Sequence, residues 1–173
     1  MTENLLLDVN ITERQIRDKI RGLRPAAAPG PDGIGPSLLQ NLHQQIVPAL
    51  QVLYRKVLDE GVTPGDWKEA NVSPIFKKGA KKDPANYRPV SLTLVCCKIF
   101  ESLLRDGIVL HLVENKLINS SQHGFVSGKS CATNFIEFFN KVTEAIDGSN
   151  AMDIIFLDFA KAFDKVPVKR LLA

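Results

Sequence analysis

One carboxylate stands where the sequence gives it no obvious compensating charge. Asp158 directly follows residues 154–157 (IIFL), a short unbroken apolar run that is typical of a strand buried on both faces. A buried, unpaired carboxylate is costly because it loses its hydration. A divalent metal ion such as Mg²⁺, which binds carboxylate oxygens, would compensate the charge. Backbone amides at a strand-to-helix turn would serve equally well, and the spacing alone does not separate the two.

The positive charge of the chain is concentrated in one segment. Residues 67–88 hold six basic side chains against two acidic ones, a local charge of +4; the whole chain carries +3, which leaves −1 for the remainder. A focused positive charge is typical of a surface that binds phosphates. A solvated hairpin tip is the alternative, and composition alone favours it. The basic residues are Lys68, Lys77, Lys78, Lys81, Lys82 and Arg88.

Helices are predicted around these residues by apolar side chains at steps of three and four. A capping box at Thr12 and Gln15 begins a helix over residues 12–23, and a long helix over 37–60 ends at Gly61, with Pro48 as a kink. A third helix is expected from Val95 to about Asn115. The fourth is capped by Ser130 and ends at Asp147-Gly148, and its apolar face is expected to belong to a core. That face consists of Phe135, Phe138, Val142 and Ile146.

Two short strands are predicted over residues 72–78 and 87–93, joined by the lysine-rich loop. Pro74 and Pro89 imply edge positions or irregular pairing in this sheet. Residues 26–35 (AAAPGPDGIG) predict an ordered loop with a turn at Asp32-Gly33.

Composition fits a globular protein or part of one, because 173 residues with 45% apolar content can bury one sizeable core. The three cysteines have neither disulfide nor CxxC spacing, which favours a reducing, intracellular compartment. No localisation signal decides between nucleus and cytoplasm. No apolar run is long enough for a membrane span, so no membrane partner is expected.

The string MDIIFLDFAKAFDKVP, residues 152–167, resembles the first catalytic motif of reverse transcriptases. Four further segments resemble, in the same order, segments of reverse transcriptases from non-LTR (LINE-type) retrotransposons of the jockey or chicken-repeat kind. They are APGPDGI (28–34), WKEANVSPIFKKG (67–79), NYRPVSLT (86–93) and QHGFVSGKSC (122–131).

This resemblance implies an α+β fold: the fingers subdomain of a right-hand polymerase, with helices and a small irregular antiparallel sheet, followed by the first strand of the palm. Residues 1–151 would be the fingers region, and residues 152–173 the start of the palm with the first catalytic motif. The family's Asp-Asp hairpin, motif-B helix and thumb have no counterpart in these 173 residues. We therefore expect the chain to be partial and to have no polymerase activity alone.

The resemblance also implies roles for single residues. Asp158 would be the catalytic ligand of Mg²⁺ ions in a two-metal nucleotidyl transfer, assisted by the backbone carbonyl of Phe159. Phe163 would lie under the sugar of the incoming nucleotide. A core residue is the alternative interpretation of Phe163.

Binding residues follow from the same resemblance. Lys77 or Lys78 and Arg88 would contact the triphosphate, whereas Lys81 and Lys82 would face solvent or the template backbone. The pocket for template and nucleotide would be lined by Gln122, His123, Gly124 and Phe125. The implied partners are an RNA template, a DNA primer and deoxynucleoside triphosphates.

Three functional hypotheses remain open at the level of sequence. The first is a partial RNA-directed DNA polymerase. The second is a non-catalytic nucleic-acid-binding remnant that keeps the basic segment. The third is an inert pseudogene product that folds poorly.

Overall fold

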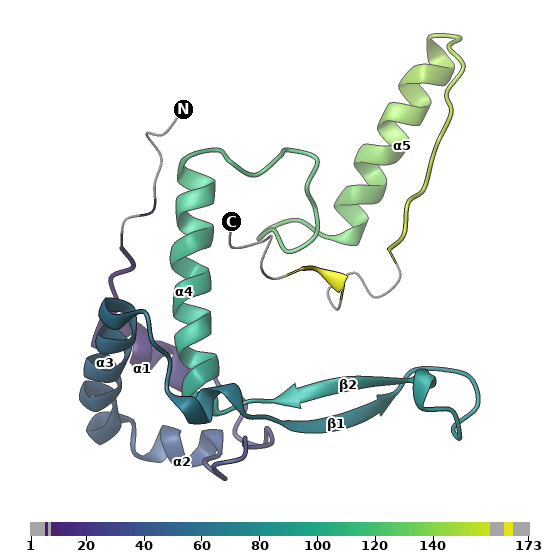
Figure 1. Cartoon of the computed structure of the whole chain (residues 1–173). Coiled ribbons are helices and arrows are strands. Elements are labelled where there is room, and N and C mark those ends of the chain that lie inside the picture. The colour runs from purple at the N-terminus through teal and green to yellow at the C-terminus, as the bar shows by residue number, and fades with distance from the viewer. Residues whose placement is uncertain (1–5, 7, 160–164, 168–173) are drawn as a thin grey trace. The chain divides into compact units, whose positions relative to one another are not determined.

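The computed structural model describes residues 6, 8–159 and 165–167, and these residues form the α+β fold that the sequence predicts. Two compact units divide the chain, Met1–Ile118 and Asn119–Ala173. Within the first unit, helices α1 to α4 pack together and strands β1 and β2 form a hairpin (Figure 1). The second unit contains helix α5. The boundary between fingers and palm expected near residue 151 is not tested by this division and stays a prediction.

Helix α1, Glu13–Arg21, begins at the predicted capping box. The backbone N–H of Gln15 donates to Thr12 Oγ1 over 3.3 Å, and the Thr12 N–H donates to Gln15 Oε1 over 2.9 Å. These bonds satisfy donors that the first turn of a helix otherwise leaves unpaired. The apolar spacing then buries Ile16 and Ile20 completely, which fixes α1 in the core.

The long helix predicted over residues 37–60 is two helices, α2 (Pro36–Asn41) and α3 (His43–Glu60), so a single helix was wrong. Leu42 interrupts the helix with ψ at 12°. Packing explains the break, because the change of direction lets both Leu39 and Val47 be buried while α2 and α3 each contact α1. α3 continues through Pro48 and ends at Gly61, whose φ of 64° favours glycine.

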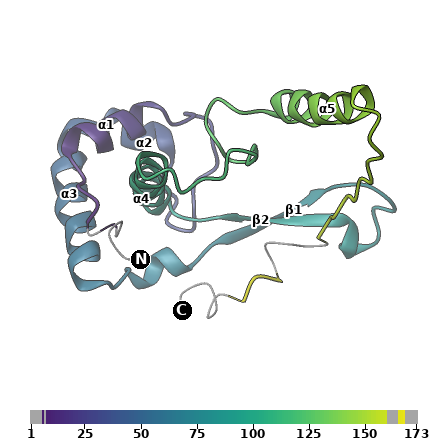
Figure 2. The same cartoon turned by 90° about the horizontal axis from the view of Figure 1, so that it is seen from above.

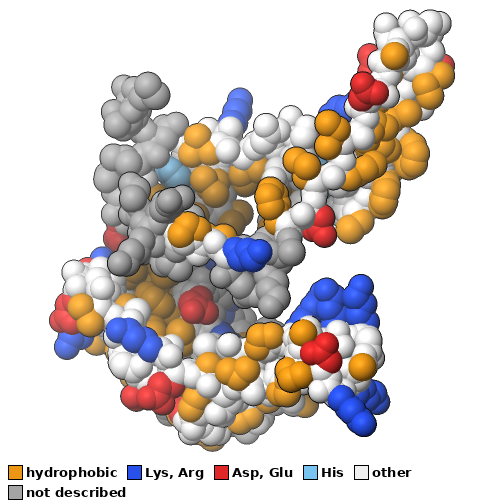
Figure 3. Space-filling view, turned by 45° about the vertical axis from the view of Figure 1, so that its right-hand side comes forward, with side chains coloured by type: hydrophobic (Ala, Val, Ile, Leu, Met, Phe, Trp, Pro, Cys, Tyr) orange, Lys and Arg blue, Asp and Glu red, His pale blue; other side chains and the backbone are white. Residues whose placement is uncertain are grey.

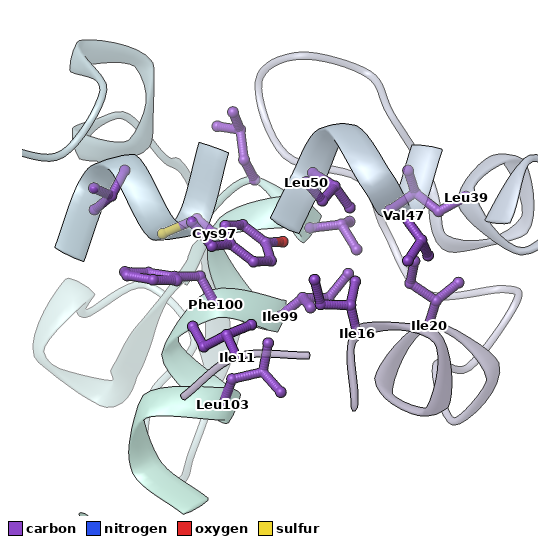
Figure 4. Packing of buried hydrophobic residues seen from close by; sticks show 14 of the residues in the cluster. Ile11, Ile16, Ile20, Leu39, Val47, Leu50, Cys97, Ile99, Phe100 and Leu103 are labelled. Carbon is purple, nitrogen blue, oxygen red and sulfur yellow. The ribbon is translucent and has the colours of Figure 1, made fainter. Parts of the chain in front are cut away.

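Helix α4, Val95–Glu114, agrees with its predicted bounds and lies among α1, α2 and α3 when it is seen end-on (Figure 2). The buried cluster takes side chains from each of these helices (Figure 4). Tyr54 of α3 is fully buried and donates its hydroxyl hydrogen to the Cys96 carbonyl over 2.8 Å. Burial raises the pKa of Tyr54 and that of the Cys97 thiol, the latter to about 11, so neither is a nucleophile at neutral pH.

Strands β1, Asn71–Phe76, and β2, Tyr87–Leu92, pair antiparallel as the sequence predicts. Pro74 lies directly opposite Pro89, so the two residues that lack a backbone N–H occupy one rung of the ladder. Short 3-10 helices precede each strand, η1 (Gly65–Lys68) and η2 (Pro84–Asn86). Buried Trp67 and Leu94 flank the hairpin and join it to the core.

Helix α5, Cys131–Asp147, has its predicted cap at Ser130 and its predicted end, but the expectation that its apolar face belongs to a core was wrong. No residue of α5 is buried, and Phe135 and Ile146 expose 62% and 67% of their surface. The physical reason is the lack of a covering layer among the described residues. Local hydrogen bonds form this helix without help from burial.

Candidate functional site

The basic segment forms the end of the β1–β2 hairpin, and its geometry is set by three backbone-directed contacts. The Lys77 N–H donates to the Asn86 carbonyl over 2.8 Å, which extends the ladder one rung beyond Phe76 and Tyr87. The Asn86 side chain donates to the Ala80 carbonyl over 3.0 Å, and the Tyr87 hydroxyl donates to the Lys81 carbonyl over 2.8 Å. These bonds order the backbone of the loop that carries the lysines.

Gly79 is required by this loop. Its φ is 93°, and a Cβ atom there would lie 2.7 to 2.9 Å from the Asn86 side chain. Asp83, the acidic residue of the loop, accepts the Ala85 N–H over 2.9 Å at the start of η2. Its carboxylate is thus engaged with the backbone.

The cations at this end of the hairpin are exposed. Figure 3 shows lysine and arginine side chains gathered there. Within the described part of the chain, none of them forms an ion pair with a carboxylate. They are Lys77, Lys78, Lys81, Lys82 and Arg88. An exposed cluster of one sign with no internal counter-charge attracts an anionic ligand.

Strand alternation assigns two of these cations to the same side of the hairpin. Arg88 pairs with Ile75 across the two strands. Lys77 lies two residues after Ile75 and pairs with Asn86 through the hydrogen bond from its backbone N–H. Residues two apart in a strand share a face, as do direct cross-strand partners. Lys77 and Arg88 therefore lie on the same side of the hairpin. Lys78 is the next residue after Lys77, so strand alternation does not place it on that side.

The segment Gln122–Phe125 lies in the second unit, in the loop before α5. The Gln122 side chain donates to the Gly124 carbonyl over 2.9 Å. A Cβ at Gly124 would meet only the Gln122 amide nitrogen, at 3.8 Å, so the chain itself has room for a side chain there. Phe125 has a φ of 61° and exposes 93% of its surface.

His123 is held by helix α5. Its Nδ1 lies 3.0 Å from Thr133 Oγ1, its Nε2 lies 2.8 Å from Glu137 Oε2, and only 8% of its side chain is exposed. Since Glu137 also accepts from Ser121 Oγ and Lys141 Nζ, at 3.0 and 2.8 Å, it fastens the loop to the helix. We call these five residues, Ser121, His123, Thr133, Glu137 and Lys141, the loop clasp.

The loop clasp was not predicted from the sequence. One signal was present: Thr133 and Glu137 are four residues apart and therefore lie one above the other on α5. Hydrogen bonds from Lys141, His123 and Ser121, in that order of effect, lower the pKa of Glu137 to about 2. Glu137 is thus an acceptor at neutral pH, and His123 Nε2 must be the donor.

Asp158 is exposed, and the buried strand expected over residues 154–157 was wrong. Ile155, Phe156 and Leu157 each expose 80% or more of their surface. A strand is stable only when a neighbour pairs with its backbone, and the described residues of this unit provide none. Phe156 instead lies near Phe138 of α5, with ring centroids 6.1 Å apart.

The described residues do not form a metal site by themselves. No group of three or more His, Cys, Asp or Glu side chains that could hold a metal ion occurs among them. Asp158 and Phe159 are both exposed, but one carboxylate does not complete the donor set of a two-metal site. Phe163 lies outside the described residues.

The predicted site residues fall into two groups in different compact units. Lys77, Lys78 and Arg88 belong to the first unit, and Gln122–Phe125 and Asp158 belong to the second. Among the residues that the structure describes, no helix is long and apolar enough to cross a membrane.

Comparisons with known proteins point to one family. Residues 77–173 match the family model described as reverse transcriptase (RNA-dependent DNA polymerase). A probable RNA-directed DNA polymerase from transposon BS of Drosophila melanogaster is 27% identical over 157 residues, which cover 90% of this chain and 17% of that protein. The RNA-directed DNA polymerase from mobile element jockey of the same species is 29% identical over 157 residues, with the same coverage.

A third relative is the probable RNA-directed DNA polymerase from the X-element of D. melanogaster, 29% identical over 140 residues. That alignment covers 80% of this chain and 15% of the relative. The chain thus spans about one sixth of the length of the curated relatives it matches. Because the family model covers more than half of the chain, and the relatives are polymerases of non-LTR retrotransposons, the chain belongs to the reverse transcriptase family.

Proposed function

We propose that this chain is the fingers region and the start of the palm of an RNA-directed DNA polymerase, and that its hairpin binds the triphosphate of the incoming deoxynucleotide. The observation that carries this proposal is the placement of Lys77 and Arg88 on one side of an ordered hairpin without any carboxylate partner among the described residues. Arg88 offers a planar fork that fits two phosphate oxygens, and Lys77 adds a point charge.

The other family assignments are part of the same proposal. Asp158 and the Phe159 carbonyl would contribute to a divalent metal site, with Mg²⁺ as the ion because hard cations prefer oxygen ligands. Phe163 would select against a ribose 2′-OH. Gln122, Gly124 and Phe125 would line the pocket for template and nucleotide, with His123 fixed behind them. An RNA template and a DNA primer would be the polymeric substrates.

Nucleotide binding is tested first by removing the two cations that share a face. Binding of a fluorescent deoxynucleoside triphosphate to the 173-residue chain is measured over a salt series. The double variant K77A/R88A should weaken binding by about tenfold or more, because each lost charge-assisted contact contributes substantially to anion binding. The variant R14A/R24A removes the same charge from exposed residues outside the hairpin and should change affinity by less than about twofold.

Equal losses in the two double variants would mean that only the net charge attracts the triphosphate, and would overturn the proposed site. The single variant K78A refines the assignment, and strand alternation predicts a smaller loss than for K77A.

Catalysis is tested separately. Because the described residues do not complete a metal site, we expect the 173-residue chain to extend no primer on an RNA template in Mg²⁺. Extension by the purified chain, abolished by D158N, would contradict that expectation. A chain that binds triphosphate but extends nothing agrees with the proposal.

A further inference from the structure

The hairpin carries one hydroxyl group on the same side as Arg88. Ser73 of β1 pairs with Val90. The residue two positions after Ser73 is Ile75, which pairs with Arg88. Residues two apart in a strand share a side with each other and with their direct partners, so Ser73 lies on the side that carries Arg88. The two are diagonal neighbours, with backbones about 7–8 Å apart, and a long side chain spans that distance.

Arg88 is the only charged residue within the two strands, Asn71–Phe76 and Tyr87–Leu92. Within the described part of the chain its guanidinium forms no ion pair with a carboxylate. An anion attached to Ser73 would therefore meet one cation and no acidic side chain from either strand. The guanidinium presents a planar fork that binds two phosphate oxygens at once.

The backbone at Ser73 is extended and open to an enzyme. Pro74 follows Ser73, and the residue before a proline is held in the extended region because the proline ring clashes with a helical conformation. The described sheet has two strands, so β1 keeps an open outer edge. The hairpin also extends away from helices α1 to α4 (Figures 1 and 2). The Ser73 side chain is partly exposed, and its hydroxyl forms no hydrogen bond with the described residues.

We propose that Ser73 is a phosphorylation site, and that its phosphate binds Arg88 and closes the proposed nucleotide site. A protein kinase that selects serine followed by proline would transfer the γ-phosphoryl group of ATP to Ser73 Oγ. The new bond joins Oγ to the γ-phosphorus, the bond from that phosphorus to the β,γ-bridging oxygen breaks, and ADP leaves. The hydroxyl proton passes to the catalytic base of the kinase.

The phosphate changes what Arg88 can bind. Phosphoserine carries a charge of about −1.5 to −2 at pH 7 and three acceptor oxygens. An incoming triphosphate then loses the fork of Arg88 and is repelled by the like charge on Ser73. The closing effect rests on the proposed function, whereas the pairing of the phosphate with Arg88 does not.

The acceptor is identified with the 173-residue chain, ATP and a purified proline-directed kinase. Thr63-Pro64 is the other dipeptide of this kind in the sequence, so it is an internal comparison. Mass spectrometry of the digested product should place phosphate on Ser73. P74A keeps the hydroxyl but removes the proline, and it should lose most of this incorporation. Incorporation confined to Thr63 would overturn the proposal.

Phosphorus-31 NMR tests the contact with Arg88 and needs no nucleotide. A T63A chain is used, so that Ser73 is the single acceptor before a proline. The second pKa of a phosphoserine is about 6, and a neighbouring guanidinium lowers it because it favours the dianion. R88A should return the pKa of the phosphate upward to that ordinary value, whereas R24A, which removes an arginine outside the hairpin, should leave it unchanged. A phosphate pKa that is the same with and without R88A would contradict the pairing.

Closure of the site is measured with a fluorescent deoxynucleoside triphosphate. Phosphorylation of the T63A chain should weaken binding by about tenfold or more. Kinase treatment of a T63A/S73A chain should not change the affinity. Ser91 pairs with Val72 on the opposite side of the hairpin, so S73D and S91D add the same charge to the two sides. We expect S73D to weaken binding at least about threefold more than S91D, and equal effects would overturn closure by a local phosphate.

Two results separate this inference from the proposed function. A chain that binds no triphosphate before phosphorylation would end the proposed nucleotide site and the closing effect with it, while the response of the phosphate pKa to R88A still decides the pairing. A phosphate whose pKa responds to R88A, in a chain that binds triphosphate equally well before and after phosphorylation, would overturn closure of the site.

Discussion

The two compact units differ in what forms their helices. In Met1–Ile118, apolar faces meet one another, and the side chains of Ile16, Ile20, Tyr54 and Val47 are fully buried. In Asn119–Ala173, α5 is formed by its cap, by hydrogen bonds with the preceding loop and by one ion pair along the helix, and no residue of α5 is buried. A helix can therefore form through local contacts alone, whereas burial and strand pairing need a partner surface.

The largest effect is expected when a buried isoleucine of the first unit, rather than an exposed isoleucine of the second, is replaced by alanine. Ile20 has no exposed surface, so I20A should lower the free energy of unfolding of the first unit by about 2–5 kcal/mol. I146A, the same substitution on the exposed face of α5, should change this free energy of unfolding by less than about 0.5 kcal/mol. Urea unfolding followed by fluorescence of Trp67, the single tryptophan and part of the first core, measures both. A similar loss for I146A would show that the α5 face is covered in solution.

Backbone packing gives the next largest effect. A Cβ at Gly30 would lie 2.8 Å from the Leu94 backbone N and Cα, which cannot move as a side chain can. G30A should therefore destabilise the first unit by about 1–3 kcal/mol in the same unfolding measurement. G65A is the control, because nothing lies within 4 Å of a Cβ at that position. An unchanged urea midpoint for G30A would show that the loop over residues 26–35 does not pack on the hairpin base.

Helices α1 and α5 both begin with a capping box, so the same kind of substitution can be compared in the two units. T12A and S130A each remove a cap that contributes about 1 kcal/mol. Because Ile16 and Ile20 hold α1 in the core, T12A should leave α1 helical, whereas S130A should increase amide hydrogen exchange through the first turns of α5. S130D supplies another good cap and should restore protection. Equal exchange in wild type and S130A would mean that contacts beyond the cap determine this helix.

The sequence predicted the elements whose signals are local. The capping box at Thr12, the cap at Ser130, the ends of α4 and α5, and the β1–β2 hairpin were confirmed. The break at Leu42 could not be predicted, because it is decided by the packing of α2 and α3 on α1 and not by any residue at the break. The buried strand predicted over residues 154–157 was wrong, because an apolar pattern does not provide the neighbouring strand that a strand must pair with.

The candidate site was also predictable only where its signals are local in the sequence. Charge density located the hairpin cations, and alternation then places Lys77 beside Arg88. The loop clasp escaped prediction because its partners, His123 and Glu137, are fourteen residues apart and meet only when the loop folds back on α5. The roles of Asp158, Phe163 and Gln122 stay predictions that rest on the family.

The smallest expected effect is the titration of the loop clasp, and it tests whether the second unit is ordered without a core. Glu137 has a pKa of about 2 against an ordinary value of 4.5, because Lys141, His123 and Ser121 donate to its carboxylate. A lowered pKa means that the folded unit binds a proton more weakly than the unfolded chain. The contribution of Glu137 to stability is therefore fully present above pH 4.5 and is lost as the pH falls through about 2.

Carbon-13 NMR of the glutamate carboxyls measures this pKa directly. K141A removes the donor with the largest effect and should move the pKa of Glu137 upward, toward 4.5, while S121A should move it less. K116A removes a lysine that does not contact Glu137 and should leave the pKa of Glu137 unchanged. If wild-type Glu137 titrated at its ordinary value, the clasp would not persist in solution, and the loop that carries Gln122–Phe125 would need a partner surface, as residues 154–157 do.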